Sequence, residues 1–168
     1  MSSIKVKQAL NDITQYPKRI LLAETREERI NIAWFSTHVK EIINKLAYIM
    51  LKLGFIPRVV SAKTFYGLKV YAPTLSTFPL KAKGFFGGED LKLTKYMADT
   101  LKSGDVFIDG GANFGWYSLL ASELGAKVYA IEPTSKIFNL LTRNVRGKDI
   151  TAYNAALWSS AGKMLFND

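Results

Sequence analysis

The sequence predicts an α/β fold built on a parallel sheet, preceded by an α-helical N-terminal segment and a short β hairpin. From residue 105 onward, short apolar strand patterns alternate with amphipathic helical patterns, and a glycine-rich turn follows the first strand. Strands that alternate with helices of this length imply right-handed crossovers and parallel pairing. A chain of 168 residues, 48% of them hydrophobic, is long enough to form one ordinary core.

The N-terminal segment has helical spacing. Thr25 and Glu28 form a capping-box pattern ahead of a helical pattern that extends to Leu53 and ends at Gly54. Its apolar positions recur every three or four residues: Val39, Ile42, Ile43, Leu46, Met50 and Leu53. We expect this stripe to pack against its own domain, the alternatives being a partner helix or a membrane surface.

A short β section follows the helical segment. Residues 58–60 and 64–71 are rich in β-branched and aromatic residues around Tyr66-Gly67, which predicts a hairpin or two edge strands before Pro73. A loop-rich connection then leads to a helix that begins after Glu89 and stops at Ser103-Gly104.

The second half supplies the parallel sheet. The predicted elements are strands at 106–108, 127–131 and 150–157, with helices at 113–124 and 134–145 between them. We therefore divide the chain into a basic helical segment (1–57), a β and loop connector (58–83) and a sheet domain (84–168).

Charge is distributed unevenly. Residues 1–84 hold 14 Lys and Arg against 5 Asp and Glu, whereas residues 85–168 hold 9 of each. A basic segment can attract nucleic acid, anionic lipid or an acidic substrate, although a solvated lysine-rich face is the simpler interpretation.

Cysteine is absent from the sequence, which excludes disulfides, thiolate zinc sites and a cysteine nucleophile. The N-terminus lacks the apolar core of a signal peptide, and no stretch is apolar enough to span a membrane. We expect a cytoplasmic protein with no metal site.

The candidate site is the turn Asp109-Gly110-Gly111-Ala112-Asn113-Phe114-Gly115, between a strand and a helix. Glycines suit a sharp turn whose backbone a ligand approaches closely. Glu132 closes the next strand 23 residues after Asp109, near the spacing at which an acidic residue reaches ribose hydroxyls. Turn and carboxylate together indicate an adenosine-containing ligand.

Two ligand classes compete for this turn. Gly110, Ala112 and Gly115 make a weakened form of the dinucleotide motif, so an NAD(P)-dependent oxidoreductase remains an alternative. The Asp109 carboxylate, however, would repel a pyrophosphate. It suits S-adenosylmethionine, which carries a sulfonium and an ammonium group.

These residues resemble the FkbM family of S-adenosylmethionine-dependent methyltransferases. The likeness covers residues 84–168 and rests on Asp109-x-Gly111-Ala112-Asn113-x-Gly115, on Glu132-Pro133, and on Asn154-Ala155-Ala156-Leu157 before Gly162. It implies a Rossmann-like class I methyltransferase sheet, of which this chain would hold only the first half. The implied reaction is methylation of a hydroxyl on a sugar or secondary metabolite.

The resemblance also implies roles for individual residues. Asp109, Gly111, Ala112, Asn113 and Gly115 would form the loop around the methionine part of S-adenosyl-L-methionine. Glu132 would bind the ribose, Asn154 belongs to the third motif, and Ala155 and Ala156 would lie near the adenine. Glu89 resembles the acidic element that precedes the first cofactor helix.

Other features stay unassigned or open. No catalytic residue can be named, since His38 is the only histidine and lies in the helical segment. Trp116 and Trp158 are expected to pack in the core. A truncated interaction module that works through its basic helices, on nucleic acid, a membrane surface or a protein, is the non-enzymatic alternative.

The sheet is expected to be incomplete after its third strand. The 106–108 strand would then have an unpaired edge, which promotes association. We therefore expect the chain to self-associate, to bind a missing second half, or to cover this edge with its own strands at 58–71.

Overall fold

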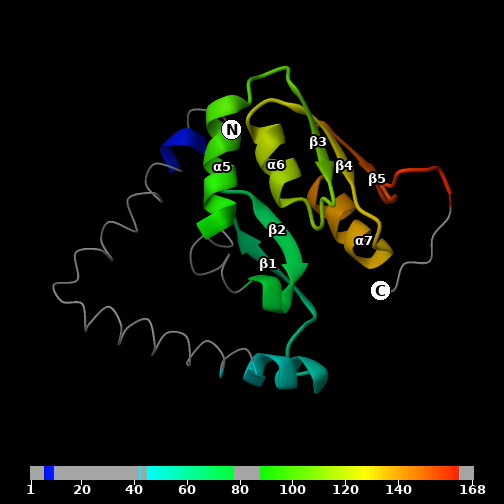
Figure 1. Cartoon of the computed structure of the whole chain (residues 1–168). Helices are drawn as coiled ribbons and strands as arrows, with labels where there is room; N and C mark the ends of the chain where they lie inside the picture. Colours follow the sequence, from blue (N-terminus) through cyan, green and yellow to red (C-terminus); the bar gives the residue numbers. More distant parts are fainter. Residues whose placement is uncertain (1–5, 10–41, 43–44, 78–87, 163–168) are drawn as a thin grey trace.

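The computed structural model describes residues 6–9, 42, 45–77 and 88–162. Their order along the chain is β1 (Val59–Lys63), β2 (Lys69–Pro73), η1 (Thr74–Ser76), α5 (Gly88–Thr100), β3 (Val106–Gly110), α6 (Trp116–Glu123), β4 (Lys127–Ile131), α7 (Ser135–Asn144) and β5 (Ile150–Tyr153) (Figure 1). Residues 45–52 form a further helix ahead of β1.

The second half forms the predicted parallel sheet. The strand order is β3-β4-β5, with Val106 opposite Lys127 in one pair and Val128 opposite Ile150 in the other. Because the strands are added in one direction, right-handed crossovers place α6 and α7 on the same face. The α/β fold class and the parallel pairing are therefore confirmed.

Two of the boundaries that differ from the prediction lie at the carboxyl edge of the sheet. Helix α6 begins at Trp116 rather than at 113, because Asn113 (φ 52°) and Gly115 (φ 91°) have left-handed backbone conformations. Strand β5 ends at Tyr153 rather than at 157. In both places the chain is irregular at the carboxyl end of the sheet where a regular element was expected.

The two faces of the sheet have different surroundings. Val128 and Ala130 of β4 are fully buried against the helical layer. On the opposite face of the sheet the side chains are not buried. Val106 and Ile108 of β3 are 60% and 64% exposed there. This second face is thus open, and apolar along β3, in the described structure.

Strands β1 and β2 form a separate antiparallel hairpin, as predicted. Val59 pairs with Pro73 and Lys63 with Lys69, and the connecting turn is closed by the Leu68 amide, which donates to Thr64 Oγ1 at 2.9 Å. Strand β2 contacts α7. The expectation that these strands cover the edge of β3 is wrong, because the hairpin packs on the helical layer instead.

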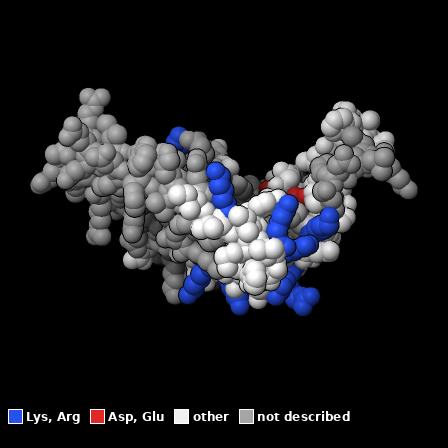
Figure 2. Space-filling model, turned by 90° about the horizontal axis from the view of Figure 1, so that it is seen from below, with Lys and Arg blue, Asp and Glu red and all other residues white. Residues whose placement is uncertain are grey.

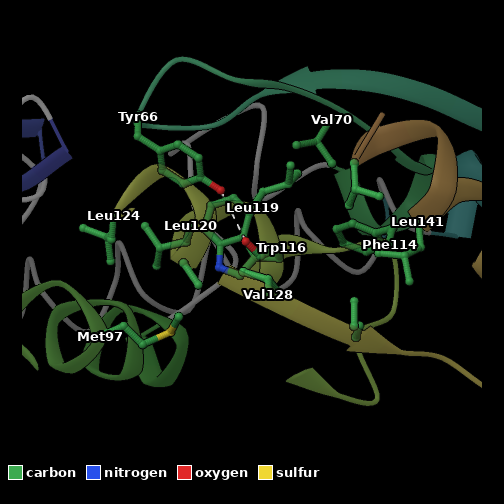
Figure 3. Packing of buried hydrophobic residues seen from close by; sticks show 14 of the residues in the cluster. Tyr66, Val70, Met97, Phe114, Trp116, Leu119, Leu120, Leu124, Val128 and Leu141 are labelled. Carbon is green, nitrogen blue, oxygen red and sulfur yellow. Dashed lines mark hydrogen bonds between the residues drawn. The ribbon is translucent and has the colours of Figure 1, made fainter. Parts of the chain in front are cut away.

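The core joins the hairpin, the helices and the sheet. Tyr66 from the hairpin turn reaches the start of α6, where its hydroxyl donates to the Trp116 carbonyl oxygen at 3.3 Å (Figure 3). Leu119, Leu120 and Val128 are also buried there. Burial of Trp116 confirms its predicted core position.

Trp158 does not share that position, because it is 67% exposed. The chain leaves the sheet after Tyr153, five residues before this tryptophan, so the prediction of core packing for Trp158 was wrong.

The helix at residues 45–52 ends at Gly54, as predicted. Gly54 has a φ of 80°, and the Phe55 amide donates to the Met50 carbonyl oxygen at 2.9 Å, which closes the helix. Thr25, Glu28, Val39 and His38 lie outside the described residues.

The apolar stripe of this helix is exposed, contrary to our expectation of packing. Leu46, Met50 and Leu53 of that stripe are 56%, 44% and 65% exposed. The hairpin that follows packs against α7, and the helix remains at one end of the molecule (Figure 1). No described helix is long and apolar enough to cross a membrane.

Candidate functional site

The turn between β3 and α6 has a backbone that most residues avoid. Gly111, Asn113 and Gly115 have φ angles of 79°, 52° and 91°. Asparagine is among the few residues other than glycine that adopt this conformation readily. The alternation of left-handed residues produces the sharp turn that the sequence predicted.

Strand β4 holds this turn in place. The amides of Gly111 and Ala112 both donate to the Ile131 carbonyl oxygen, at 2.8 and 2.9 Å. The Asn113 amide donates to Glu132 Oε2 at 2.9 Å. Three successive amides of the turn are thus fixed by the end of the neighbouring strand.

Glu132 connects two loops through its carboxylate. While Oε2 accepts from Asn113, Oε1 accepts from the Thr134 amide at 2.9 Å, at the start of α7. The residue is 6% exposed. A carboxylate oxygen has more than one lone pair, so each can still accept a hydrogen bond from a ligand.

Asp109 is the penultimate residue of β3 and lies beside the same turn. It is 8% exposed, and its Oδ2 accepts from the Ser118 hydroxyl of α6 at 2.6 Å. Burial raises the pKa of the Asp109 carboxyl, hydrogen bonds from Ser118 oppose this, and the charge of Glu132 adds to the increase. Two buried carboxylates therefore influence one another at this edge.

Asn154 attaches the end of β5 to the loop after β4. Its Nδ2 donates to the carbonyl oxygens of Glu132 and Pro133, at 2.8 and 3.0 Å. Its Oδ1 accepts from the Ser135 hydroxyl at 3.2 Å. The loops after all three strands are consequently joined by hydrogen bonds at the carboxyl edge of the sheet.

The glycines of the turn have different surroundings. A Cβ atom at Gly111 would meet nothing within 4 Å, so open space lies beside this backbone. At Gly115 it would lie 2.8 Å from Leu141 Cδ1, and at Gly110 2.7 Å from Leu157 Cδ1. Gly115 is therefore required for packing, whereas Gly111 leaves room for a ligand.

The structure brings most of the predicted site residues together. Asp109, Gly111, Ala112, Asn113, Gly115, Glu132 and Asn154 all lie at the carboxyl edge. Ala155 and Ala156 follow directly and are exposed. Glu89 lies in the first turn of α5, and its side chain is outside the described part.

Sequence reasoning missed two residues here. Ser118 binds Asp109, and Leu157 lies against Gly110. The sequence did contain a signal for Ser118. It is a serine in the first turn of the helix that follows the strand with Asp109, where its hydroxyl can reach that carboxylate. Leu157 stands in the quoted motif that begins at Asn154, but no local pattern placed it beside Gly110, because its position depends on where β5 ends. Among the described residues, no group of His, Asp or Glu could hold a metal ion.

No family model matches the chain, and no curated protein matches it significantly. Solved structures that it resembles include TYW2 of P. horikoshii in complex with MeSAdo, at 27% identity and a TM-score of 0.46 over 59% of this chain and 36% of that one. A SAM-dependent methyltransferase from Agrobacterium tumefaciens matches at 13% identity and a TM-score of 0.48, over 60% of this chain and 33% of that one.

A third similar structure is the tRNA m1G37 methyltransferase of M. jannaschii, at 20% identity and a TM-score of 0.40 over 53% of this chain and 25% of that one. The chain thus spans between a quarter and about a third of the length of these three proteins.

Proposed function

We propose that this chain is the cofactor-binding part of an S-adenosylmethionine-dependent methyltransferase. The observation that carries the proposal is the pair of buried carboxylates, Asp109 and Glu132, on either side of a glycine turn that is open at Gly111. Adjacent parallel strands present them at their carboxyl ends, where ligands of open α/β sheets bind.

The charge of this edge suits the cofactor. Burial is the main cause that raises the pKa of the Asp109 carboxyl, and the charge of Glu132 adds a smaller increase, because the two negative charges repel one another. A ligand with cationic groups would relieve this repulsion, whereas a pyrophosphate would increase it. The site therefore favours S-adenosylmethionine over a nicotinamide dinucleotide.

Each residue has a defined part in the proposed binding. Asp109 and the backbone at Gly111 would hold the amino acid portion, and Glu132 would accept from the ribose hydroxyls. Asn154 orders the loop from which Ala155 and Ala156 would border the adenine. When bound, the cofactor supplies an electrophilic methyl group, and the rigid turn would fix its direction.

We further propose that the protein belongs to the FkbM family and is cytoplasmic. The residues from Asp109 to Gly115, together with Glu132-Pro133 and Asn154-Ala155-Ala156, support this assignment. Its acceptor would be a hydroxyl of a sugar or secondary metabolite. The hydroxyl oxygen would attack the sulfonium methyl group, the methyl–sulfur bond would break to leave S-adenosylhomocysteine, and the hydroxyl proton would pass to solvent. The two carboxylates at the turn, Asp109 and Glu132, are assigned to the cofactor, so no residue is named as the base.

Isothermal titration calorimetry tests the proposal. S-adenosylhomocysteine should bind to the wild-type chain, and NADH should give no heat. Glu132→Ala should weaken the S-adenosylhomocysteine affinity by at least about tenfold, because hydrogen bonds to a charged group are lost. Asp99→Ala is the matched control, since it removes an exposed carboxylate from α5.

The outcomes test the proposed binding site and the proposed class of protein separately. Binding of NADH alone, or of neither ligand, would overturn the proposed function. Binding of S-adenosylhomocysteine that survives Glu132→Ala would refute the site and leave the class standing. A circular dichroism spectrum of Glu132→Ala is needed beside these titrations, because this residue also holds the turn.

A further inference from the structure

The helix at residues 45–52 presents an apolar stripe to solvent. Leu46, Ile49, Met50 and Leu53 are 56%, 51%, 44% and 65% exposed, and they recur at helical spacing on one side. Phe55, directly after the helix, is 73% exposed. Contiguous exposed apolar side chains of this kind mark an interaction surface.

Another side of the same helix is less exposed. Ala47 is buried and Leu51 is half-buried, and both lie on the flank opposite to Lys45 and Lys52 at 100° per residue. The helix therefore has three sides: one buried or half-buried, one apolar and open, and one cationic.

Positive charge surrounds this stripe. Between Glu41 and Glu89 the sequence contains seven Lys or Arg and no Asp or Glu. Lys45, Lys52 and Arg58 are exposed on or next to the helix, and Lys52 Nζ lies 5.0 Å from the centroid of the Tyr48 ring. Figure 2 shows this end of the molecule with Lys and Arg side chains around white atoms and little Asp or Glu in view.

We propose that this face, defined as Leu46, Ile49, Met50, Leu53 and Phe55 with Lys45, Lys52 and Arg58, binds the surface of an anionic lipid bilayer. The apolar side chains would enter the boundary between headgroups and acyl chains, and the cations would contact lipid phosphates. The helix would lie in the plane of the surface and not cross it.

Charge and apolar character together favour lipid over other occupants. A nucleic acid would satisfy the cations but would leave the aliphatic stripe in water. A second copy in a twofold interface would bring two basic faces together. Because neither face has acidic side chains, the like charges would repel one another. An anionic bilayer satisfies both features at once.

Vesicle flotation with the full chain tests this proposal. We expect it to float with vesicles of equal parts phosphatidylcholine and phosphatidylserine, and to bind pure phosphatidylcholine vesicles at least about tenfold more weakly. Binding to the anionic vesicles should fall as salt is added.

Two variants separate the apolar and cationic contributions. Ile49→Ser with Leu53→Ser should weaken binding by at least about tenfold. Leu93→Ser with Tyr96→Ser is the matched control, because these α5 side chains are also exposed, at 45% and 66%. Lys45→Gln with Lys52→Gln should abolish the preference for anionic vesicles. All six positions are exposed, so the variants are expected to fold.

Three results would overturn the proposal. The first is no binding to either vesicle, or equal loss in the control variant. The second is binding to a structured RNA that needs Lys45 and Lys52 without any vesicle binding. The third is a dimer in sedimentation equilibrium that Ile49→Ser with Leu53→Ser converts to monomer while vesicles stay unbound.

Discussion

Glu132 fixes the candidate site before any ligand is bound. Both of its carboxylate oxygens accept hydrogen bonds from backbone amides, one from Asn113 and one from Thr134. The sequence predicted this residue as a ribose ligand from its spacing to Asp109, but a spacing does not reveal hydrogen bonds within the chain. A glutamate that orders the turn would also lower the entropic cost of binding there.

Asp109 should make the stability of the fold depend on pH. Because burial raises its pKa above the ordinary value of 3.8, the folded chain takes up a proton more readily than the unfolded chain as pH falls. Its contribution to the free energy of unfolding should therefore rise from neutral pH toward about pH 4. Urea unfolding of wild type and of Asp109→Asn over this range measures the contribution as the difference between them.

Ser118→Ala is the control for this prediction. The Ser118 hydroxyl lowers the pKa of Asp109, so its loss should keep the pH dependence and move it to higher pH. If Asp109→Asn and wild type lose or gain stability in parallel, the assignment to Asp109 is wrong.

The residues of the turn were predictable, but their partners were not. A glycine-rich turn can be recognised in the sequence, and so can an acidic residue near the end of a strand pattern. The Ser118 and Leu157 contacts depend on tertiary packing, which no local pattern encodes.

Among the elements, α7 connects the hairpin to the sheet through its last residue. Asn144 Oδ1 accepts from the Tyr71 amide at 2.8 Å, and its Nδ2 donates to the carbonyl oxygens of Tyr71 and Phe114, both at 2.8 Å. The Arg143 guanidinium lies 3.5 Å from the centroid of the Tyr71 ring. The Asn144 side chain thus satisfies both backbone groups of Tyr71 in β2, as a neighbouring strand would.

Asn144→Ala should lower the free energy of unfolding by about 2 kcal/mol, because it leaves partly buried backbone groups of Tyr71 and Phe114 without partners. Asn139→Ala is the matched control, an exposed asparagine on the same helix, and should change it by less than about 0.5 kcal/mol. Chemical denaturation measures both. Equal effects would show that the Asn144 hydrogen bonds to Tyr71 and Phe114 contribute nothing specific.

Gly115 tests the contact between the site turn and α7. Gly115→Ala meets both a left-handed backbone and Leu141 Cδ1 at 2.8 Å, whereas Gly147→Ala has a similar φ of 76° and nothing within 4 Å. We expect Gly147→Ala to cost about 1 kcal/mol and Gly115→Ala at least about 1 kcal/mol more. Thermal unfolding of the two variants gives the difference, and equal melting temperatures would contradict the packing role.

The existence and type of the elements could be predicted better than their ends. The bounds of β4 were predicted because alternation and flanking polar residues mark it at both ends. The start of α6 was not, since an asparagine with positive φ looks in the sequence like a helix cap. The exposure of the stripe at residues 45–52 could not be predicted either, because periodicity shows that a face is apolar and not what covers it.

At the scale of the whole molecule, the sheet is open on one side. Val106 and Ile108 are more than half exposed on β3, whose other edge has no partner strand in the described part of the chain. Parallel sheets are normally covered on both faces. We predict that the chain associates through this surface, either with another copy or with a segment that completes the sheet.

Ile108→Glu should weaken this association. Sedimentation equilibrium should show wild type above the monomer mass at micromolar concentrations and Ile108→Glu as a monomer, because a buried carboxylate is costly. Leu93→Glu, which changes an exposed leucine on α5, should behave as wild type. A wild type that stays monomeric would contradict association between copies through this surface and would leave only the completing segment.

The binding of the cofactor at the carboxyl ends of β3 and β4 is tested most directly by heteronuclear NMR during titration with S-adenosylhomocysteine. The amide signals of Gly111, Asn113 and Thr134 should shift, because their hydrogen bonds border the proposed site. Those of β1 should stay in place. Shifts confined to the hairpin or to α5, or no shifts at saturating ligand, would contradict the proposed site.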